Sequence, residues 1–402
     1  MVESPVPLAP GGHAFDPVIG GSPPAAPPPQ RRSHPARIWM LGGLAVIVIG
    51  AACAGVQWSA NVGYDDALVA FEDAVDGAQA DQARLDEAAA SLTETMDAAT
   101  VVAGARTDLL MDAESTETLD AAVESAAVAV DEATSLADDS LPVAAAKPVW
   151  AWELFGATAQ LDEERDDAAQ QRDDFDDARH GAEAASEALT DAGMAAVIAA
   201  AGAADEFEAA HVSARNLDIL DLRRRAEQVS GAAVLDATTA EAYAGLETAA
   251  AAMIASEKAE LAEKQGPLFQ ARTEIEAFAR GLAPGVLLDF DWSALVNGYG
   301  YGDSMGGYAT WWYGDPGYST IELSNSVAEY WPGARSKALV AHEVGHAISV
   351  KCEGMYDDSN SGTVEAWATA WAISKGFTDA ANGTSAYGAP SQSLIDAAAG
   401  CR

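Results

Sequence analysis

An uncharged apolar segment near the N-terminus constrains this chain more than any other feature. The segment IWMLGGLAVIVIGAACAGV, residues 38–56, is 19 residues long and contains no charged side chain. A helix of that length spans the roughly 30 Å hydrocarbon core of a bilayer. We therefore predict that residues 38–57 form a transmembrane helix and contact the lipid bilayer.

The charges on either side of this segment predict its orientation. Arg31, Arg32 and Arg37 precede it, whereas four acidic residues follow it within residues 65–73. Because basic residues favour the cytoplasmic side, we expect a single-pass signal anchor in the cell membrane, with the C-terminal bulk outside the cell. A cleaved signal peptide is the alternative, but residues 1–37 are a long, Pro-rich leader for one. We expect these 37 residues to be a disordered cytoplasmic tail.

The acidity of the chain belongs to its middle. Asp and Glu number 62 against 22 Lys and Arg, and residues 38–266 carry about −33 of the net charge of −40. Such a surface repels nucleic acid, so we expect no nucleic-acid partner. Residues 58–266 are rich in Ala, Glu and Asp, with apolar residues three and four apart. This spacing predicts an all-α, coiled-coil-like region that could also associate with a second copy.

Within this region many apolar positions are only alanine, which favours close helix packing over a leucine zipper. No repeat of fixed period is recognisable. Residues 141–156, LPVAAAKPVWAWELFG, contain two prolines and interrupt the helical pattern. We predict a corner between antiparallel helices there, with Trp150 and Trp152 as packing residues.

The character of the sequence changes after residue 266. Of 29 aromatic residues, 18 lie in residues 267–402, as expected of a compact core. Residues 285–292 alternate like a strand, and residues 308–324 contain two alternating runs that predict a hairpin. Helical patterns follow at residues 332–350 and 363–376. Strands followed by helices predict an α+β domain.

The first of these helices contains the sequence HEVGH. His342 and His346 are four residues apart, so on a helix both imidazoles lie on one face and can reach one metal ion. Glu343 can then take a proton from metal-bound water. The surrounding residues are apolar, and unpaired polar groups would be costly there. We predict a zinc site with Glu343 as its general base.

A catalytic zinc needs a third protein ligand and an open position for water. Two residues are candidates. Cys352 lies ten residues after His342, and Glu365 lies 19 residues after His346 near the start of an apolar helix. A thiolate outside the cell would be prone to oxidation, and Cys401 offers Cys352 a disulfide partner. We predict Glu365 as the ligand and leave Cys352 as the alternative.

With HEVGH on one helix and Glu365 on the next, residues 267–402 resemble the gluzincin metallopeptidases. The strand YSTIELS, residues 318–324, also looks like the edge strand that lines a zincin cleft. The resemblance implies a zincin-like fold, Zn²⁺ held by His342, His346 and Glu365, and hydrolysis of a peptide or protein substrate. Many gluzincins carry an acidic residue four positions after the ligand glutamate to orient a histidine. Thr369 occupies that position here.

The sequence thus predicts a membrane-anchored extracellular zinc metallopeptidase. Two other functions stay open: a non-enzymatic helical scaffold, and a metal-binding sensor or adhesion module. The residue that stabilises the oxyanion is not specified, because Tyr308, Tyr330 and Tyr356 all lie in the same domain.

Overall fold

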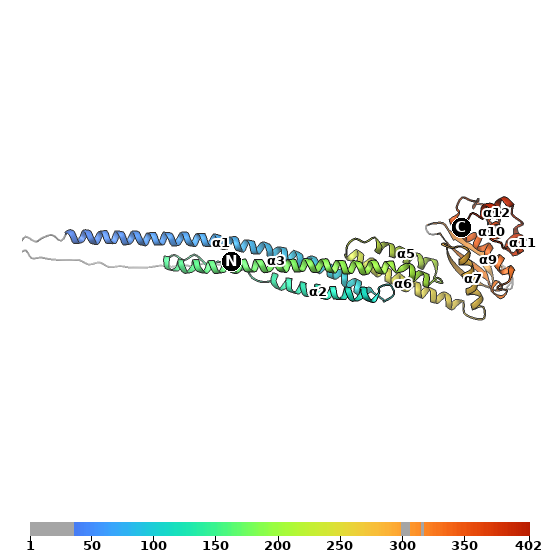
Figure 1. The fold of residues 1–402 in the computed structure, drawn as a ribbon, viewed down its shortest axis with the longest axis horizontal. Helices are drawn as coiled ribbons and strands as arrows, with labels where there is room; N and C mark the ends of the chain where they lie inside the picture. Colours follow the sequence, from blue (N-terminus) through green and yellow to red (C-terminus); the bar gives the residue numbers. More distant parts are fainter. Residues whose placement is uncertain (1–35, 299–305, 315–316) are drawn as a thin grey trace, which may run out of the picture. The chain divides into compact units, whose positions relative to one another are not determined.

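The computed structural model describes residues 36–298, 306–314 and 317–402, and for residues 36–46 it describes the backbone alone. The described chain is mostly helical, with a small three-stranded sheet towards its C-terminal side (Figure 1). Apart from Ala36 and Arg37, the predicted tail lies outside the described residues.

The chain divides into two compact units, which are described separately. The first comprises Met1–Leu68 and Ala145–Gln160, and the second comprises Val69–Ala144 and Leu161–Arg402. The second unit contains two hydrophobic cores, one built from residues 78–253 and the other from residues 275–401.

In the first unit, the N-terminal part of α1 (Ala36–Ala105) is joined by the start of α3 (Ala151–Gly202). The predicted anchor, residues 38–57, lies within α1 and is helical. The residues before α3 are extended and bond to α1: the Tyr64 hydroxyl donates to the carbonyl of Ala145, and Lys147 pairs with Asp65. Residues 141–150 of the segment predicted as a corner are therefore an extended strap rather than a tight corner, and residues 151–156 are the first turns of α3.

The prediction that Trp150 and Trp152 are packing residues is wrong. Their rings stack on each other with centroids 5.2 Å apart, but both side chains are more than half exposed. The prediction rested on the expectation that aromatic residues next to a proline fill a buried turn. In the structure, the end of the strap and the start of α3 leave both rings exposed.

In the second unit, α1 continues beside α2 (Ala113–Ala137) and α3 (Figure 1). The chain then forms α4 (Ala204–Ala210), α5 (Asn216–Ser230) and α6 (Ala237–Glu263). Aspartates cap two of these helices: Asp112 accepts from the backbone N–H of Ser115, and Asp236 from that of Thr239. Such caps satisfy amide groups that have no partner in the first turn of a helix.

Seven buried residues along α3 are spaced seven positions apart, a repeat that the sequence pattern did not suggest. They are Leu154, Leu161, Ala168, Phe175, Ala182, Leu189 and Ala196. A seven-residue repeat is the coiled-coil period. Alanine occupies three of the seven positions, which hides the repeat from a reading based on large apolar residues, and it allows the close packing that the composition predicts.

One helix among those with described side chains, Ala151–Ala210, is long and apolar enough to cross a membrane by length and composition. Core helices of soluble proteins meet the same criterion, and 39% of the qualifying window is buried. The predicted anchor includes residues 38–46, whose side chains lie outside the described part, so this finding does not bear on it.

After α7 (Phe269–Leu282), the chain forms the sheet from β1 (Leu287–Ser293), β2 (Gly307–Trp312) and β3 (Tyr318–Ser324). The strand order is β1-β3-β2; β3 is parallel to β1 and antiparallel to β2. The predicted strand and antiparallel pair are therefore present. However, β3 is the central strand and not the edge strand that its sequence suggested, because β1 pairs with its second side.

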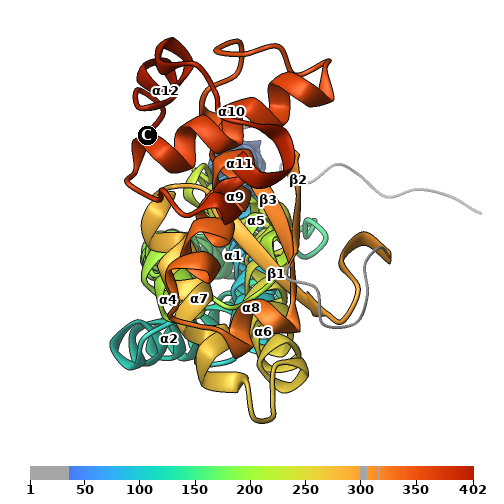
Figure 2. The same ribbon diagram turned by 90° about the vertical axis from the view of Figure 1, so that its right-hand side faces the viewer.

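The helices α7, α8 (Asn325–Glu329) and α9 (Ala334–Ala347) pack against this sheet. Behind them α10 (Ser361–Ser374) packs on α9, and α11 (Thr384–Tyr387) and α12 (Gln392–Ala398) pack on α10. Short 3₁₀ turns lie at Val296–Gly298, Ile348–Lys351 and Ala380–Asn382. Figure 2 shows α9 beside the sheet, and α10 packs on α9. A disulfide joins Cys352, which follows α9, to Cys401 at the C-terminus.

The opposite side of β1 meets the helical region. Asp289 and Asp291 alternate with the buried Leu288 and Phe290, so they face away from the core. The backbone N–H of Asn216, at the start of α5, donates to Asp289. Arg215 pairs with Asp291 at 2.8 Å, and the Asn216 side chain donates to the carbonyl of Ser319 at 2.9 Å. These contacts join the helical region to the sheet.

Candidate metal centre

The helix α9 presents the HEVGH sequence inside the C-terminal core. It begins after Gly333 and is buried without interruption from Val340 to Ala347. His342, Glu343 and His346 are each only 5% exposed. Since burial of unpaired polar groups costs several kcal/mol, three such groups on one buried helix require compensating partners.

Gly345 brings α10 close enough to supply one of those partners. A Cβ atom at this position would lie 2.7 Å from the carbonyl oxygen of Ala368 and 2.9 Å from its Cα, so only glycine allows the two helices to approach this closely. Glu365 is one turn before Ala368 on α10 and therefore faces the two histidines. The glycine of HEVGH thus has a geometric role that its sequence did not reveal.

Three donor atoms converge between the two helices. Nε2 of His342 lies 3.2 Å from Nε2 of His346, and one carboxylate oxygen of Glu365 lies 3.1 Å from the former and 3.3 Å from the latter. Zn–N and Zn–O bonds of about 2.0–2.1 Å in a tetrahedral arrangement separate the ligand atoms by about 3.3 Å. The triangle of donor atoms therefore has dimensions into which a metal ion such as zinc would fit.

The protonation of His342 favours a positive charge in this triangle. Its Nδ1 lies 3.0 Å from the carbonyl oxygen of Asn382, so Nδ1–H donates to that oxygen and, in the neutral ring, Nε2 presents a lone pair. That lone pair faces a carboxylate oxygen and a second imidazole. Such a cluster is stable only with a cation, either a proton or a metal ion, between its members.

The pKa values of the same groups agree with this electrostatic argument. Burial opposes charge on His342, but its hydrogen bond to Glu365 and the nearby carboxylates raise the pKa of the imidazole above its ordinary value. Burial likewise acts against the Glu365 carboxylate, yet its hydrogen bonds to His342 and His346 lower its pKa to about 2. The Glu365 carboxylate is thus ionised at neutral pH, as binding of a metal ion would require.

Glu343 lies beside this triangle and has a different environment. Its carboxylate packs against Gly307 of β2, where a Cβ atom would lie 2.6 Å from Oε1. Burial raises the pKa of Glu343, and among the described residues its carboxylate has no hydrogen-bond partner. A buried carboxylate of raised pKa beside three groups that could hold a metal ion is suited to accept and return a proton.

The orientation of His342 comes from a segment that the sequence did not suggest. Asn382 supplies the carbonyl, and the Oγ1 atom of Thr369 lies 3.4 Å from the same Nδ1 while donating to the carbonyl of Glu365. Gly383, which follows Asn382, has a φ of 101°, and a Cβ atom there would lie 2.7 Å from Nδ1 of His342. Glycine therefore allows this turn to lie against the imidazole. A backbone carbonyl thus orients this histidine.

Two aromatic side chains complete the walls of the site and were also missed. Trp311 of β2 stacks on His346, with ring centroids 5.5 Å apart, and Tyr387 of α11 stacks on His342 at 5.9 Å. Burial and the negative charges of Glu365 and Glu343 raise the pKa of Tyr387, so it keeps its proton. One indication of this part of the site is present in the sequence: the dipeptide Asn382-Gly383 indicates a turn, and the short helix that bears Tyr387 follows it.

The structure also separates the alternatives that the sequence left open. Cys352 is paired with Cys401, whereas Glu365 lies with the two histidines. Of the three tyrosines considered for the oxyanion, Tyr330 is 65% exposed at the end of α8, Tyr356 stacks on Trp367, and Tyr308 is exposed on the strand next to Gly307. Within the described part of the chain, Tyr387 is the tyrosine whose ring contacts the histidine pair.

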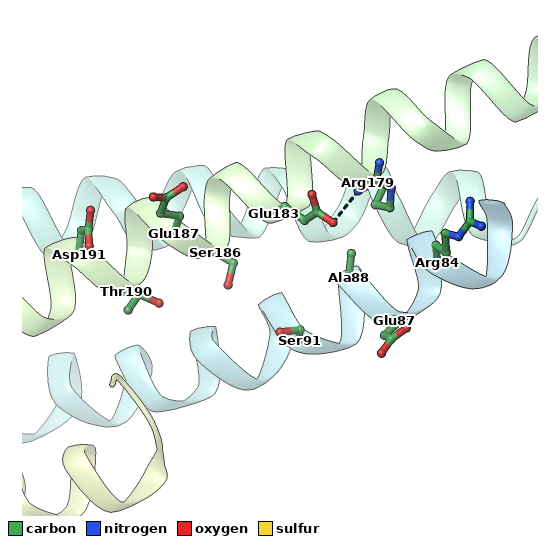
Figure 3. A pocket seen from close by; sticks show the side chains of 10 residues that line it. All are labelled: Arg84, Glu87, Ala88, Ser91, Arg179, Glu183, Ser186, Glu187, Thr190 and Asp191. Carbon is green, nitrogen blue, oxygen red and sulfur yellow. Dashed lines mark hydrogen bonds and ion pairs between the residues drawn. The ribbon is translucent and has the colours of Figure 1, made fainter. Parts of the chain in front are cut away.

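A hollow of about 600 Å³ lies between α1 and α3 (Figure 3). It is open, and its two arginines are paired with carboxylates: Arg179 with Glu183 at 2.6 Å, and Arg84 with Asp81. The residues around it are Arg84, Glu87, Ala88, Ser91, Arg179, Glu183, Ser186, Glu187, Thr190 and Asp191. This set contains no histidine or cysteine and has no feature of a metal or nucleophilic site.

No family model, curated protein or solved structure matches this chain.

Proposed function

We propose that residues 267–402 form a zincin-like metallopeptidase domain, and that residues 38–57 anchor it in the cell membrane with this domain outside. The observation that supports the activity most strongly is the triangle of Nε2, Nε2 and carboxylate oxygen with sides of 3.1–3.3 Å, beside a buried carboxylate. His342, His346 and Glu365 would hold Zn²⁺, which would acidify a bound water and polarise a peptide carbonyl.

The protein residues around the site would carry out the remaining steps. Glu343 would accept the proton of the attacking water and return it to the leaving amine. The Asn382 carbonyl would hold His342 in the tautomer whose Nε2 faces inward. The ring of Tyr387 stacks on His342, and we assign its phenol as the donor to the developing oxyanion.

The exposed side of β2 gives a route for an extended substrate. β2 pairs only with β3 among the described strands, so no described strand covers its second edge. An extended peptide can add to such an edge by main-chain hydrogen bonds. On β2, Gly307 lies against Glu343 and Trp311 lies against His346, so a peptide on this edge would pass the metal site.

Zinc titration of the metal-stripped full chain tests the ligand assignment. The parent should bind one zinc ion per chain, and His346→Ala and Glu365→Ala should each weaken that binding severely. His211→Ala is the matched control, because His211 pairs with Glu257 in the helical region, outside the triangle. Full affinity in Glu365→Ala would refute the assignment of the third ligand. Zinc binding by a parent that cleaves no peptide would instead favour the metal-binding module.

A further inference from the structure

An exposed aromatic patch lies in the first compact unit. Trp58 is 72% exposed and Trp152 is 69% exposed, and Val149, Trp150 and Phe155 are each more than half exposed. We call Trp58, Val149, Trp150, Trp152 and Phe155 the aromatic patch. Single exposed apolar residues are ordinary, but five such side chains from two segments mark an interaction surface.

Hydrogen bonds fix the position of this patch along α1. The side-chain amide of Gln57 donates to the carbonyl of Val149 at 3.0 Å, and its Oε1 accepts from the backbone N–H of Ala151 at 2.9 Å. The first amide of α3 is thus capped by a residue of α1. The start of α3 is therefore held level with Gln57.

Gln57 directly follows the uncharged segment, residues 38–56, so α3 starts beside the end of that segment. From there α3 runs in the same direction as α1, since Arg172 pairs with Asp81 further along both helices. With a rise of about 1.5 Å per residue, Trp58 lies about 3 Å beyond Val56 and Phe155 about 8 Å beyond it. The polar headgroup layer on each side of a bilayer is about 5–8 Å thick, so the aromatic patch occupies that depth.

We propose that the aromatic patch lies in the headgroup layer of the lipid bilayer and forms a second membrane contact, beside the transmembrane helix. This inference rests on the proposed anchor. Tryptophan favours this layer because its ring is apolar and its indole N–H can still hydrogen-bond. The apolar residues Ile47, Ile49 and Val56 of α1 are also exposed in the chain, as expected of side chains that lipid covers.

The charges near the patch indicate which lipids it contacts. Asp65 and Glu153 flank it, and the only basic side chain in the strap, Lys147, is paired with Asp65 at 2.6 Å. The patch therefore has no basic cluster that would attract anionic headgroups. Its contact with the membrane should be apolar and should form equally well on zwitterionic lipid.

Spin labels on the full-length chain test this placement. In a Cys53→Ser background, with the Cys352–Cys401 disulfide left oxidised, single cysteines would be placed by Ile47→Cys, Trp152→Cys, Phe155→Cys and Ala159→Cys. The labelled chains would be reconstituted as single copies in phosphatidylcholine nanodiscs. Collisions of each label with oxygen, which enters lipid, would be compared with collisions with a water-soluble nickel chelate.

Ala159 is the matched control, because it lies on the same face of α3, two turns beyond Trp152 and about 13 Å beyond the level of Val56. We expect oxygen to dominate at position 47, an intermediate ratio at 152 and 155, and nickel to dominate at 159. Adding anionic lipid should leave this order unchanged.

Three other results would overturn the proposal. If position 47 is in lipid but 152 and 155 are as accessible to nickel as 159, the anchor stands and the second contact does not. If nickel dominates at position 47 as well, the anchor and the second contact both fail. Labels at 152 and 155 that are shielded from oxygen and nickel alike would mean that protein, rather than lipid, covers the patch.

Discussion

His342 is held by contacts from three separate segments of the chain. Its Nε2 faces Glu365 of α10, its Nδ1 donates to Asn382, and its ring stacks on Tyr387. The sequence predicted that His342, His346 and Glu365 lie together, with Glu343 beside them. This was possible because the spacing within one helix and the presence of a second helix soon after it are local patterns. The sequence did not predict Asn382 or Tyr387, since their positions depend on how the last 40 residues fold back over α9.

At the same scale, Gly307 makes room for the carboxylate of Glu343. In Gly307→Ala the new Cβ atom would lie 2.6–2.7 Å from the Glu343 side chain, which is the flexible partner and must move. We expect kcat to fall by about 10²-fold or more, as for other displaced catalytic bases, with little change in zinc content or thermal stability.

The neighbouring Gly306 supplies the control for this substitution. Among the described residues, a Cβ atom at Gly306 would meet only Val296, at an ordinary 3.8 Å, so Gly306→Ala should retain activity. Steady-state kinetics and metal analysis on both variants make the comparison. Equal activity in the two alanine variants would mean that the position of Glu343 does not matter.

At the scale of the elements, the contact between α9 and α10 determines whether Glu365 can reach the histidines. In Gly345→Ala the added methyl group would meet the backbone of Ala368, which cannot rotate away. We expect a loss of about 1–3 kcal/mol in the free energy of unfolding and a weaker affinity for zinc, measured by denaturant unfolding and metal titration.

Gly281 on α7 serves as the matched helical control. It has open space where a Cβ atom would be, and alanine is the better helix former, so Gly281→Ala should be neutral or slightly stabilising. If Gly345→Ala binds zinc as tightly as Gly281→Ala, close packing of the two helices is not what positions Glu365.

The elements themselves followed from the sequence to different extents. The alternation around Leu288 and Phe290 predicted β1, and the apolar pattern around HEVGH predicted α9. The order of the strands could not be predicted, because a local pattern does not tell which side of β3 receives β1. The strap before α3 was predicted as a corner, since two prolines end a helix without specifying where the chain goes next.

At the scale of the whole molecule, the junction between α5 and β1 should make stability depend on pH. Burial raises the pKa of Asp289 to about 7, against the lowering effects of the Asn216 N–H and Arg215, and Glu260 and Asp291 raise it further. The folded chain therefore binds a proton on Asp289 that the unfolded chain releases near its ordinary pKa of 3.8. Stability from this group is present below pH 4 and is lost as the pH rises through 7.

Asp289→Asn should remove this pH dependence, because asparagine keeps an oxygen for the Asn216 N–H but carries no charge. We expect the variant to gain stability relative to the parent by about 1–3 kcal/mol between pH 5 and pH 8. Denaturant unfolding at the two pH values measures this gain. A difference between the two proteins that stays constant with pH would show that Asp289 does not titrate in this range.

The large-scale organisation was predicted from composition in part. The shift from alanine and acidic residues to aromatic residues at 266 coincides with the change from one hydrophobic core to the other. The compact units divide elsewhere, because the N-terminal part of α1 and the start of α3 associate through Gln57. Such long-range hydrogen bonds leave no periodic trace in a sequence.

The central claim is that the HEVGH helix holds a catalytic zinc ion, and Glu343→Gln tests it most directly. Glutamine keeps the shape of the side chain but cannot accept the proton of water. Glu343 contributes none of the three donor atoms of the triangle, so the substitution should leave metal binding intact. The full-length parent and variant would be loaded with zinc, analysed for metal content and incubated with a peptide library read by mass spectrometry. We predict equal zinc in both and a loss of about 10²–10⁴-fold in peptide hydrolysis in the variant. A variant that cleaves peptides as fast as the parent would contradict the account.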